Sequence, residues 1–307
     1  MNILVLGAGT WGTTLAKVLN QNSHSVTLWH YKNIFIKKME QNRYHPNLKV
    51  PISENIILTS EFKEFEKFDM LVIAVPTQSI RQVLNKIKKF HNDLIIVNAS
   101  KGIEVSSLKT ISNIIKDITL LSKSNIVALY GPSHAEEVAK KIPTTVVSAC
   151  TNINTARKIQ DVFSNQYFRV YSNNDIKGVE IGGAVKNIIA IAAGITIGIG
   201  YGDNTISALI TRGIAEIKRL GIKMGAKEKT FLGLSGIGDL IVTAMSTHSR
   251  NRTLGLELGK GKKINEVIED MEMVVEGVQT SKAIYKLAKK MKVDMPICNN
   301  VYQILFN

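Results

Sequence analysis

The chain has 307 residues, of which 45% are hydrophobic, and Lys and Arg outnumber Asp and Glu by 14. This length predicts two domains, and the composition excludes a disordered chain. The basic residues are scattered without interleaved aromatic ones, which favours a solvated surface suited to anionic small molecules over nucleic-acid binding. The two cysteines, Cys150 and Cys298, have no CxxC or metal-ligand spacing. We therefore expect a reducing compartment and no metal. The N-terminal residues Met1–Gly7 have no basic n-region and too short an apolar run for a signal peptide, so we expect none.

A glycine motif, Gly7-Ala-Gly-Thr-Trp-Gly12, lies between an apolar run at Asn2–Leu6 and a helical pattern that continues to Leu19. In this strand–turn–helix context the first glycine allows a tight turn, Gly9 lets a pyrophosphate approach the backbone, and Gly12 lets the helix pack on the strand. The free N–H groups of the helix start favour an anion. The motif predicts dinucleotide binding.

The next predicted strand, Ser25–Trp29, ends at His30-Tyr31-Lys32. An NAD-specific fold places an acidic residue here for the ribose 2′-OH, and this chain has none. His30 and Lys32 would instead tolerate or attract a 2′-phosphate. The sequence thus predicts that NADP(H) is accepted, and it leaves open which nucleotide is preferred.

The first part of the chain alternates strands and helices, and the rest is helical, which predicts an α/β fold with a doubly wound sheet followed by an all-α domain. The predicted hinge sequence, Asn173–Gly178, divides residues 1–174 from residues 175–307. Helices are predicted at Phe35–Arg43, Ser79–Phe90 and Thr155–Phe163. Eight strands are predicted: Asn2–Leu6, Ser25–Trp29, Ile56–Leu58, Asp69–Val75, Leu94–Asn98, Val127–Tyr130, Thr145–Cys150 and Phe168–Tyr171.

Two candidate positions follow strands of this sheet. Lys101 lies just past Leu94–Asn98, where ligands bind in open α/β sheets, although a turn lysine fits as well. Gly131-Pro-Ser precedes acidic residues, so Ser133 is either a plain helix N-cap or a helix start that faces a substrate anion.

Lys186 is the only charged residue between Ile181 and Tyr201. A lysine that reaches solvent, a membrane span, and a desolvated acid–base lysine with a lowered pKa all fit this pattern. Lys186 and Asn187 are costly in lipid, and five glycines weaken a hydrophobic span, which disfavours the membrane.

Two polar motifs in the second half suit a substrate site. Asp239 ends a glycine-rich stretch that lacks the P-loop ending, so it is either a helix-start carboxylate or a partner of Lys186. Ser249-Arg-Asn-Arg252 is either a surface turn or a phosphate-binding group.

These motifs together resemble those of bacterial-type NAD(P)-dependent glycerol-3-phosphate dehydrogenase, in the family's order along nearly the whole chain. The matching stretches are Gly7–Gly12, Lys101-Gly-Ile, Gly131-Pro-Ser, Gly178 to Ile188, Asn204 to Gly213, Gly233 to Leu240, Ser249–Arg252 and Val275 to Thr280. The resemblance implies an N-terminal Rossmann-like domain, a helical substrate domain, a cytoplasmic homodimer, and NAD(P)H as cofactor. The implied reaction is reversible reduction of dihydroxyacetone phosphate to sn-glycerol 3-phosphate for phospholipid synthesis.

The resemblance also implies roles for individual residues. Lys186 matches the catalytic lysine. Substrate-contacting positions correspond to Lys101, Gly131, Ser133, Lys186, Asp239, Ser249, Arg250 and Asn251. Cofactor positions correspond to Gly7, Gly9, Thr10, Trp11, Gly12, His30, Lys101, Ala135, Arg250, Val274 and Glu276.

Two rival functions share parts of this pattern. One is another dehydrogenase of the same two-domain plan, acting on a small hydroxy substrate that carries a phosphate or carboxylate. The other is a dinucleotide-sensing protein without catalysis, which would need the glycine motif but not Lys186, Asp239 and Arg250 together.

Overall fold

The chain forms two compact units whose segments interleave in the sequence. The structure, a computed structural model, describes residues 1–62, 65–271 and 275–307. The first unit holds residues 1–100, 112–129 and 133–176, and the second holds residues 101–111, 130–132 and 177–307. The two short insertions from the first half of the chain carry Lys101 and Gly131 into the helical unit.

The first unit is built on an eight-stranded sheet with the order β10-β9-β8-β7-β6-β1-β2-β5. The pairs β1–β2, β1–β6, β2–β5, β6–β7, β7–β8 and β9–β10 are parallel. The strands are β1 (Asn2–Leu6), β2 (Ser25–Trp29), β5 (Ile56–Thr59), β6 (Met70–Ile73), β7 (Ile95–Asn98), β8 (Ile126–Tyr130), β9 (Thr144–Ala149) and β10 (Phe168–Asn173). All eight predicted strands are confirmed. The inner strands β6, β7 and β8 are buried on both faces, as short apolar runs predict, whereas the edge strands β5 and β10 alternate buried and more exposed residues.

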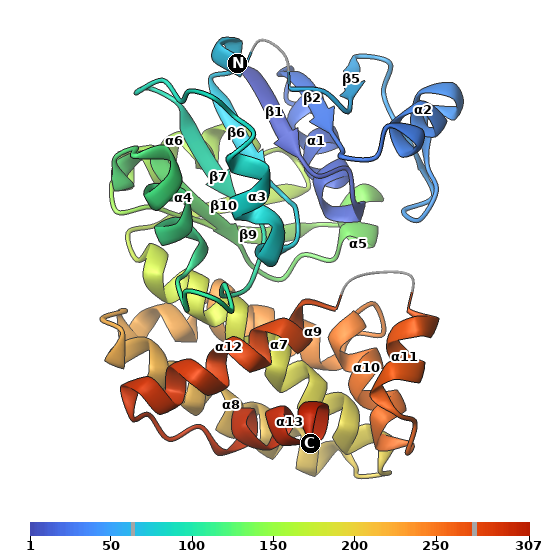
Figure 1. The fold of residues 1–307 in the computed structure, drawn as a ribbon, viewed down its shortest axis with the longest axis vertical. Coiled ribbons are helices and arrows are strands. Elements are labelled where there is room, and N and C mark those ends of the chain that lie inside the picture. The colour runs from blue at the N-terminus through green and yellow to red at the C-terminus, as the bar shows by residue number, and fades with distance from the viewer. Residues whose placement is uncertain (63–64, 272–274) are drawn as a thin grey trace. The chain divides into compact units, whose positions relative to one another are not determined.

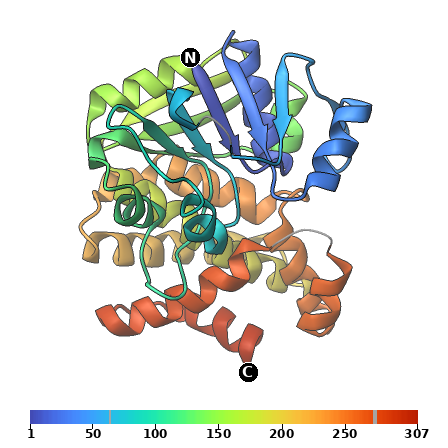
Figure 2. The same cartoon turned by 45° about the horizontal axis from the view of Figure 1, so that its top comes forward.

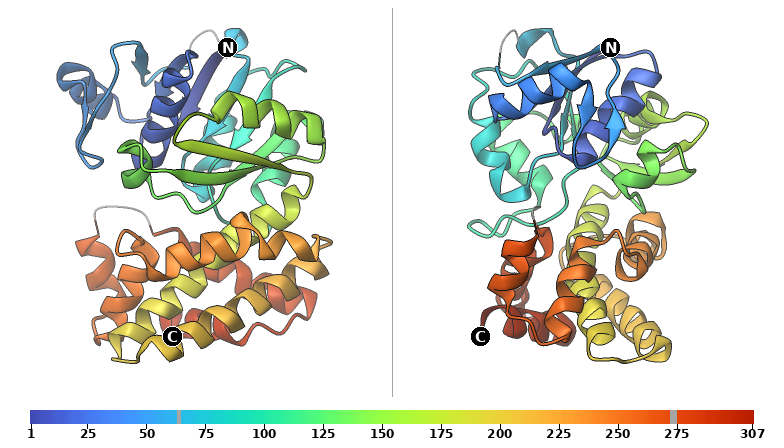
Figure 3. Two further views of the ribbon diagram at one scale, coloured as in Figure 1. Left: turned by 180° about the vertical axis from the view of Figure 1, so that it is seen from behind. Right: turned by 90° about the vertical axis from the view of Figure 1, so that its right-hand side faces the viewer.

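Helices cover both faces of this sheet. Figures 1 and 3 show α3 and α4 on one face and α1 and α6 on the other. The bounds are α1 (Thr10–Gln21), α2 (Asn33–Asn42), α3 (Ile80–Leu84), α4 (Ile111–Thr119), α5 (Ala135–Ala139) and α6 (Ile153–Phe163), and an antiparallel pair joins β3 (Tyr44–His45) to β4 (Val50–Pro51).

The predicted helix at 79–90 is wrong in length, since α3 ends at Leu84. Val83 and Ile87 are both buried, as the apolar period requires. Ile87 is buried although it lies beyond the end of α3, so its place in the apolar pattern does not require a helical backbone. Tertiary packing therefore decides the length of this helix.

In the second unit, the described part of residues 177–307 is helical apart from its turns and loops, whereas the insertions 101–111 and 130–132 are mostly non-helical and hold an isolated bridge between Ile103 and Thr110. In Figures 1 and 2, α12 and α13 lie side by side near the C-terminus. The helices are α7 (Ile176–Gly198), α8 (Asp203–Lys223), α9 (Asp239–Met245), α10 (Arg250–Gly259), α11 (Ile264–Asp270), α12 (Glu276–Met291) and α13 (Pro296–Phe306), and a π-helical turn spans Leu234–Gly238.

Helix α7 is the central helix of this unit. It is long and apolar enough to cross a membrane, but 78% of its most apolar window is buried inside the protein. Residues from Val179 to Ala193 are all buried, on every side of the helix. A helix that is apolar all round is expected in the core of a protein as well as in a membrane. The burial of α7 therefore agrees with the core alternative.

Helices α7 and α10 approach closely through reciprocal glycines. Gly194 and Gly198 of α7 face Gly255 and Gly259 of α10, with each pair spaced four residues apart. An added Cβ at any of the four would overlap a backbone carbonyl oxygen of the other helix (Arg252, Leu256, Ile191 and Ile195, respectively). Only the absence of side chains permits this spacing. The contact fixes α10 against the helix that carries Lys186.

Candidate active site

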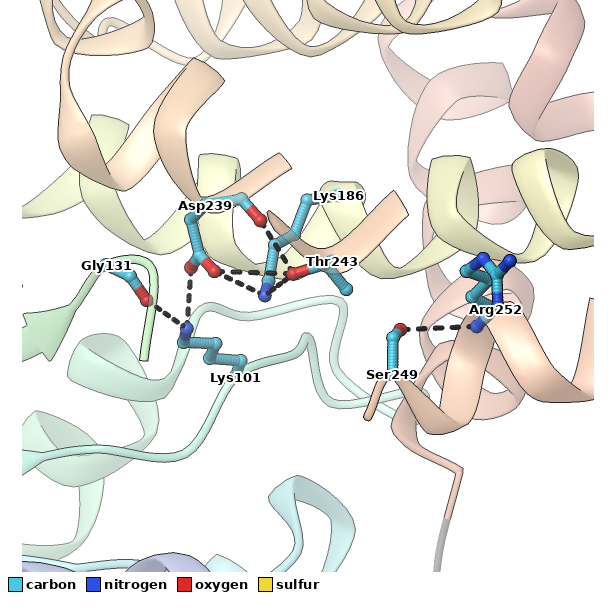
Figure 4. A network of polar contacts seen from close by, with 7 residues as sticks. All are labelled: Lys101, Gly131, Lys186, Asp239, Thr243, Ser249 and Arg252. Carbon is cyan, nitrogen blue, oxygen red and sulfur yellow. Dashed lines mark hydrogen bonds and ion pairs between the residues drawn. The ribbon is translucent and has the colours of Figure 1, made fainter. Parts of the chain in front are cut away.

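Lys186 lies inside the helical unit, where its ammonium group donates to two side chains. Its side chain is 7% exposed, and Nζ donates to Asp239 Oδ1 at 2.6 Å. A second hydrogen bond runs from Nζ to Thr243 Oγ1 at 2.5 Å, and the Thr243 hydroxyl donates in turn to the Asp239 carbonyl at 2.6 Å. Figure 4 shows these contacts converging on one point. A lysine whose ammonium group reaches solvent would be more exposed than this, so that alternative is wrong.

Asp239 joins two lysines. Its Oδ2 accepts a hydrogen bond from Lys101 Nζ at 2.6 Å, and its side chain is only 1% exposed. The carboxylate is the first residue of α9 and directly follows the π-helical turn. Lys101 Nζ also donates to the Gly131 carbonyl at 3.1 Å (Figure 4). Both sequence alternatives for Asp239 therefore hold: it starts a helix, and it pairs with Lys186.

Burial and charge act in opposite directions on this cluster. Desolvation lowers the pKa of Lys186 to about 7, although the Asp239 carboxylate raises it, and the charge of Lys101 lowers it further. Burial by itself would raise the pKa of Asp239, but Lys101 and Lys186 together hold it below its ordinary value. Lys186 is thus present both as ammonium and as amine near neutral pH, while Asp239 stays a carboxylate. A group whose pKa lies near the operating pH is suited to act both as a general acid and as a general base.

The start of α10 carries the second group of predicted residues. Ser249 is the N-cap, and its Oγ accepts from Arg252 N at 3.3 Å. Arg250 is exposed at the first helical position, whereas Asn251 is buried and its Oδ1 accepts from Gly277 N at 3.0 Å. With Oδ1 held in this way, the Asn251 amide nitrogen is the end that can donate to an anion. The motif is a helix start, not a surface turn, and helix starts favour phosphate.

The glycine loop of the first unit has the shape that a dinucleotide requires. Gly7 has φ +114, and a Cβ there would lie 2.6 Å from the Ala74 carbonyl oxygen. A Cβ on Gly12 would overlap the Gly7 carbonyl, so this glycine permits the helix to pack on the turn. A Cβ on Gly9 would meet nothing within 4 Å. Open space beside Gly9, at the N-terminus of a twelve-residue helix, fits the close approach of a pyrophosphate.

Neighbouring residues complete this end of the first unit. Thr10 begins α1, and Thr14 Oγ1 donates to the Ala135 carbonyl at 3.4 Å, which ties α1 to α5. Trp11 packs against the cluster that contains Ala135. Thr10, Trp11 and Ala135 thus lie together in the first unit.

His30 follows β2 and is half-buried. Its Nδ1 accepts from Lys32 N at 3.1 Å, so Nε2 carries the proton. Burial lowers the pKa of His30 from its ordinary value. At neutral pH His30 is therefore a neutral N–H donor through Nε2.

Comparison with known proteins gives the same family for both halves of the chain. The N-terminal model of NAD-dependent glycerol-3-phosphate dehydrogenase matches residues 2–156, and the C-terminal model matches residues 175–307. The chain belongs to this family. As a glycerol-3-phosphate dehydrogenase family member, it is an NAD(P)-dependent oxidoreductase.

Relatives in the family are similar over their full length. The glycerol-3-phosphate dehydrogenases (NAD(P)+) of Lysinibacillus sphaericus and Bacillus subtilis are each 51% identical over 99% of this chain, covering 92% and 90% of those proteins. The crystal structure of glycerol-3-phosphate dehydrogenase from Coxiella burnetii is 34% identical, with a TM-score of 0.93 over 99% of this chain and 94% of that one. A D-mandelate dehydrogenase at 15% identity and a TM-score of 0.67 shares the fold alone.

The structure brings together most of the predicted residues of the helical unit. Lys101, Gly131, Asp239 and Lys186 form one network, and the α10 start touches α12 through Asn251 and Gly277. Glu276 is the first residue of α12, and Val274 lies outside the described residues.

One local assignment is wrong, and one contact residue was missed. The N-cap of α5 is His134, so Ser133 is not a helix cap; it sits in the turn before the helix. Thr243 was not predicted, although its spacing of four residues from Asp239 places both on one helix face. The described residues contain no group of three or more His, Cys, Asp or Glu side chains that could hold a metal ion.

Proposed function

We propose that this protein catalyses the reversible NAD(P)H-dependent reduction of dihydroxyacetone phosphate to sn-glycerol 3-phosphate for phospholipid synthesis, with Lys186 as the general acid and base. The buried Lys186–Asp239–Lys101 cluster is the observation that carries this proposal. Its single carboxylate and two amines suit a reaction in which negative charge develops on a substrate oxygen.

These residues donate and accept the proton of the reaction. When bound, NAD(P)H would supply the hydride that the carbonyl carbon accepts. As the carbonyl oxygen becomes an alkoxide, the Lys186 ammonium stabilises it and delivers a proton; in the oxidation direction the neutral amine removes that proton. Asp239 and Thr243 fix the direction of the Nζ atom through the hydrogen bonds at 2.6 and 2.5 Å. General acid–base help of this kind contributes about 10²–10⁴-fold to the rate.

The phosphate ester is assigned to the cations and donors around the start of α10. Arg250 offers a planar fork of N–H groups, Asn251 offers its amide nitrogen, and the helix N-terminus adds a partial positive charge. Ser249 holds that helix start, and Lys101, Gly131 and Ser133 supply further substrate contacts in this proposal. Holding the phosphate fixes the carbonyl in position for transfer.

The cofactor is assigned chiefly to the glycine loop. Residues 1–174 would form the nucleotide-binding domain and residues 175–307 the substrate domain. Gly7, Gly9, Thr10, Trp11 and Gly12 would hold the pyrophosphate, with His30 at the adenosine ribose and Ala135 beside the loop. Lys101, Arg250, Val274 and Glu276 are proposed as further cofactor contacts. We also propose that the protein works as a cytoplasmic homodimer.

The role of Lys186 is tested by replacing it. Lys186→Met should lower kcat for dihydroxyacetone phosphate by at least about 10²-fold, while NADPH still binds, because only the acid–base group is removed. Turnover by initial rates and NADPH binding by fluorescence titration measure the two effects. Near-normal turnover would rule out the proposed role.

The phosphate site is tested at Arg250. Arg250→Ala should raise KM for dihydroxyacetone phosphate more than KM for NADPH, because a charge-assisted contact to the phosphate is lost. Arg252→Ala, two residues further along the same helix, is a matched control for the loss of a guanidinium group. Equal increases in both KM values for Arg250→Ala would count against the phosphate assignment.

A further inference from the structure

Lys101 has a third contact besides Asp239 and Gly131. Its Nζ lies 5.6 Å from the centroid of the Tyr130 ring, within the range of a cation–π interaction. Tyr130 is the last residue of β8 and is only 1% exposed. The ammonium group is thus bounded by a carboxylate, a backbone carbonyl and the electron-rich face of a buried ring.

The ring occupies space that a glycine of α7 leaves open. A Cβ on Gly183 would lie 2.5 Å from Tyr130 Cδ2 and 2.8 Å from Cε2, so no larger residue fits while the ring stays in place. The same Cβ would lie 3.6 Å from Lys101 Cγ. Gly183 precedes Lys186 by three residues, on nearly the same face of α7. The ring therefore packs against the helix that carries the proposed acid–base lysine, and the stem of Lys101 lies beside the same glycine.

We propose that Tyr130 is a positioning residue of the active site: its ring, seated against Gly183, keeps the Lys101 ammonium on Asp239 Oδ2 and leaves Oδ1 to Lys186. This inference rests on the proposed function of Lys186. In this proposal Tyr130 acts through the π face and the volume of its ring. It takes no part in proton or hydride transfer.

The consequence reaches Lys186 through Asp239. The charged groups that act on the Lys186 ammonium are Asp239, which raises its pKa, and Lys101, which lowers it. Without the ring, Lys101 loses a face that holds it and gains room to move away from Asp239. The positive charge of Lys101 then lowers the pKa of Lys186 less, and Asp239 pairs mainly with Lys186. The pKa of Lys186 therefore moves upward from about 7. The substrate also loses a positioned ammonium group.

The test compares three variants. Tyr130→Phe keeps the ring and should retain the wild-type pH profile. Tyr130→Leu and Tyr130→Met remove the ring, and Met keeps more of its volume in case Leu does not fold. Both should lower kcat/KM for dihydroxyacetone phosphate by about 2- to 30-fold, the range of a cation–π contact. They should also move the falling limb of the reduction rate to higher pH.

The pH midpoint separates positioning from simple stability. A purely structural role would lower the melting temperature of Tyr130→Leu or Tyr130→Met but leave the midpoint where Tyr130→Phe has it. A midpoint and a substrate KM that match those of Tyr130→Phe would therefore overturn the proposal. If Lys186→Met is inactive and Tyr130→Met behaves as Tyr130→Phe, only the positioning role fails. If Lys186→Met keeps normal turnover, the proposed function fails first.

Discussion

Asp239→Asn gives the sharpest test of the electrostatics in the site. The substitution keeps the shape of the side chain and removes the charge that raises the pKa of Lys186. Desolvation and the neighbouring Lys101 then act alone, and both lower that pKa. The expected direction is therefore downward from about 7.

The magnitude follows from the cost of breaking a buried ion pair. Removing one partner of such a pair costs about 3–5 kcal/mol, and about 1.4 kcal/mol equals one pKa unit, so the pKa of Lys186 should fall by about two to four units. At pH 7 the ammonium form then drops from about half of the molecules to about 10⁻²–10⁻⁴ of them. The reduction rate, which needs the ammonium form, should fall by a similar factor.

The assay is the initial rate of dihydroxyacetone phosphate reduction at saturating NADPH, measured across the pH range in which the enzyme stays folded. Thr243→Val is the matched control, because it removes a hydrogen bond to Lys186 Nζ without changing any charge. Its midpoint should move by less than about one unit. A midpoint for Asp239→Asn at or above the wild-type value would refute the account of how Asp239 tunes Lys186.

The remaining predictions concern stability. The pKa of Lys186 is about 7 in the folded protein, and its ordinary value is 10.5. Between these two pH values the unfolded chain binds more protons at this lysine than the folded protein does, so the free energy of unfolding rises with pH. The cost of burying Lys186 is therefore largest below pH 7. Lys186→Met also removes a partner of the buried Asp239 carboxylate, which is a cost that does not change between pH 7 and pH 10 because Asp239 stays ionised. The change in the free energy of unfolding caused by Lys186→Met should therefore be more favourable at about pH 7 than at about pH 10, by up to about 3–4 kcal/mol; urea melts that show the same change at both pH values would contradict this. Gly255→Ala places a methyl group on the Ile191 carbonyl and should cost about 1–3 kcal/mol, whereas Gly202→Ala, where a Cβ meets nothing within 4 Å, should cost less than about 1 kcal/mol. Equal losses in thermal melts of these two variants would argue against close α7–α10 packing as the cause.

Local pattern was sufficient for most of the fold. Short apolar runs with β-branched residues predict buried strands, and Gly7, Gly9 and Gly12 predict the first turn, because both depend on a few consecutive residues. Local pattern was insufficient for the end of α3. Ile87 is buried whether or not its backbone is helical, so its place in an apolar period does not decide where the helix stops.

The active site required contacts across long stretches of sequence. From Lys186 alone, three environments remained possible, because the charge of a lysine does not reveal its solvent exposure. Asp239 lies 53 residues away and Lys101 lies 138 residues from Asp239, so only the fold could bring their charges within 2.6 Å. The family resemblance named these residues in advance, but it did not indicate which atom of the carboxylate meets which lysine.

The sequence by itself determined the order of elements, the glycine loop and the presence of a single charged residue, Lys186, between Ile181 and Tyr201. Tertiary structure alone decided that this lysine is buried, that Thr243 and Asp239 share its ammonium group, and that Tyr130 stands against Gly183 beside Lys101. The physical reason is that hydrophobic periodicity and turn chemistry act over a few residues, whereas desolvation and Coulomb interactions depend on what the folded chain places around a charge.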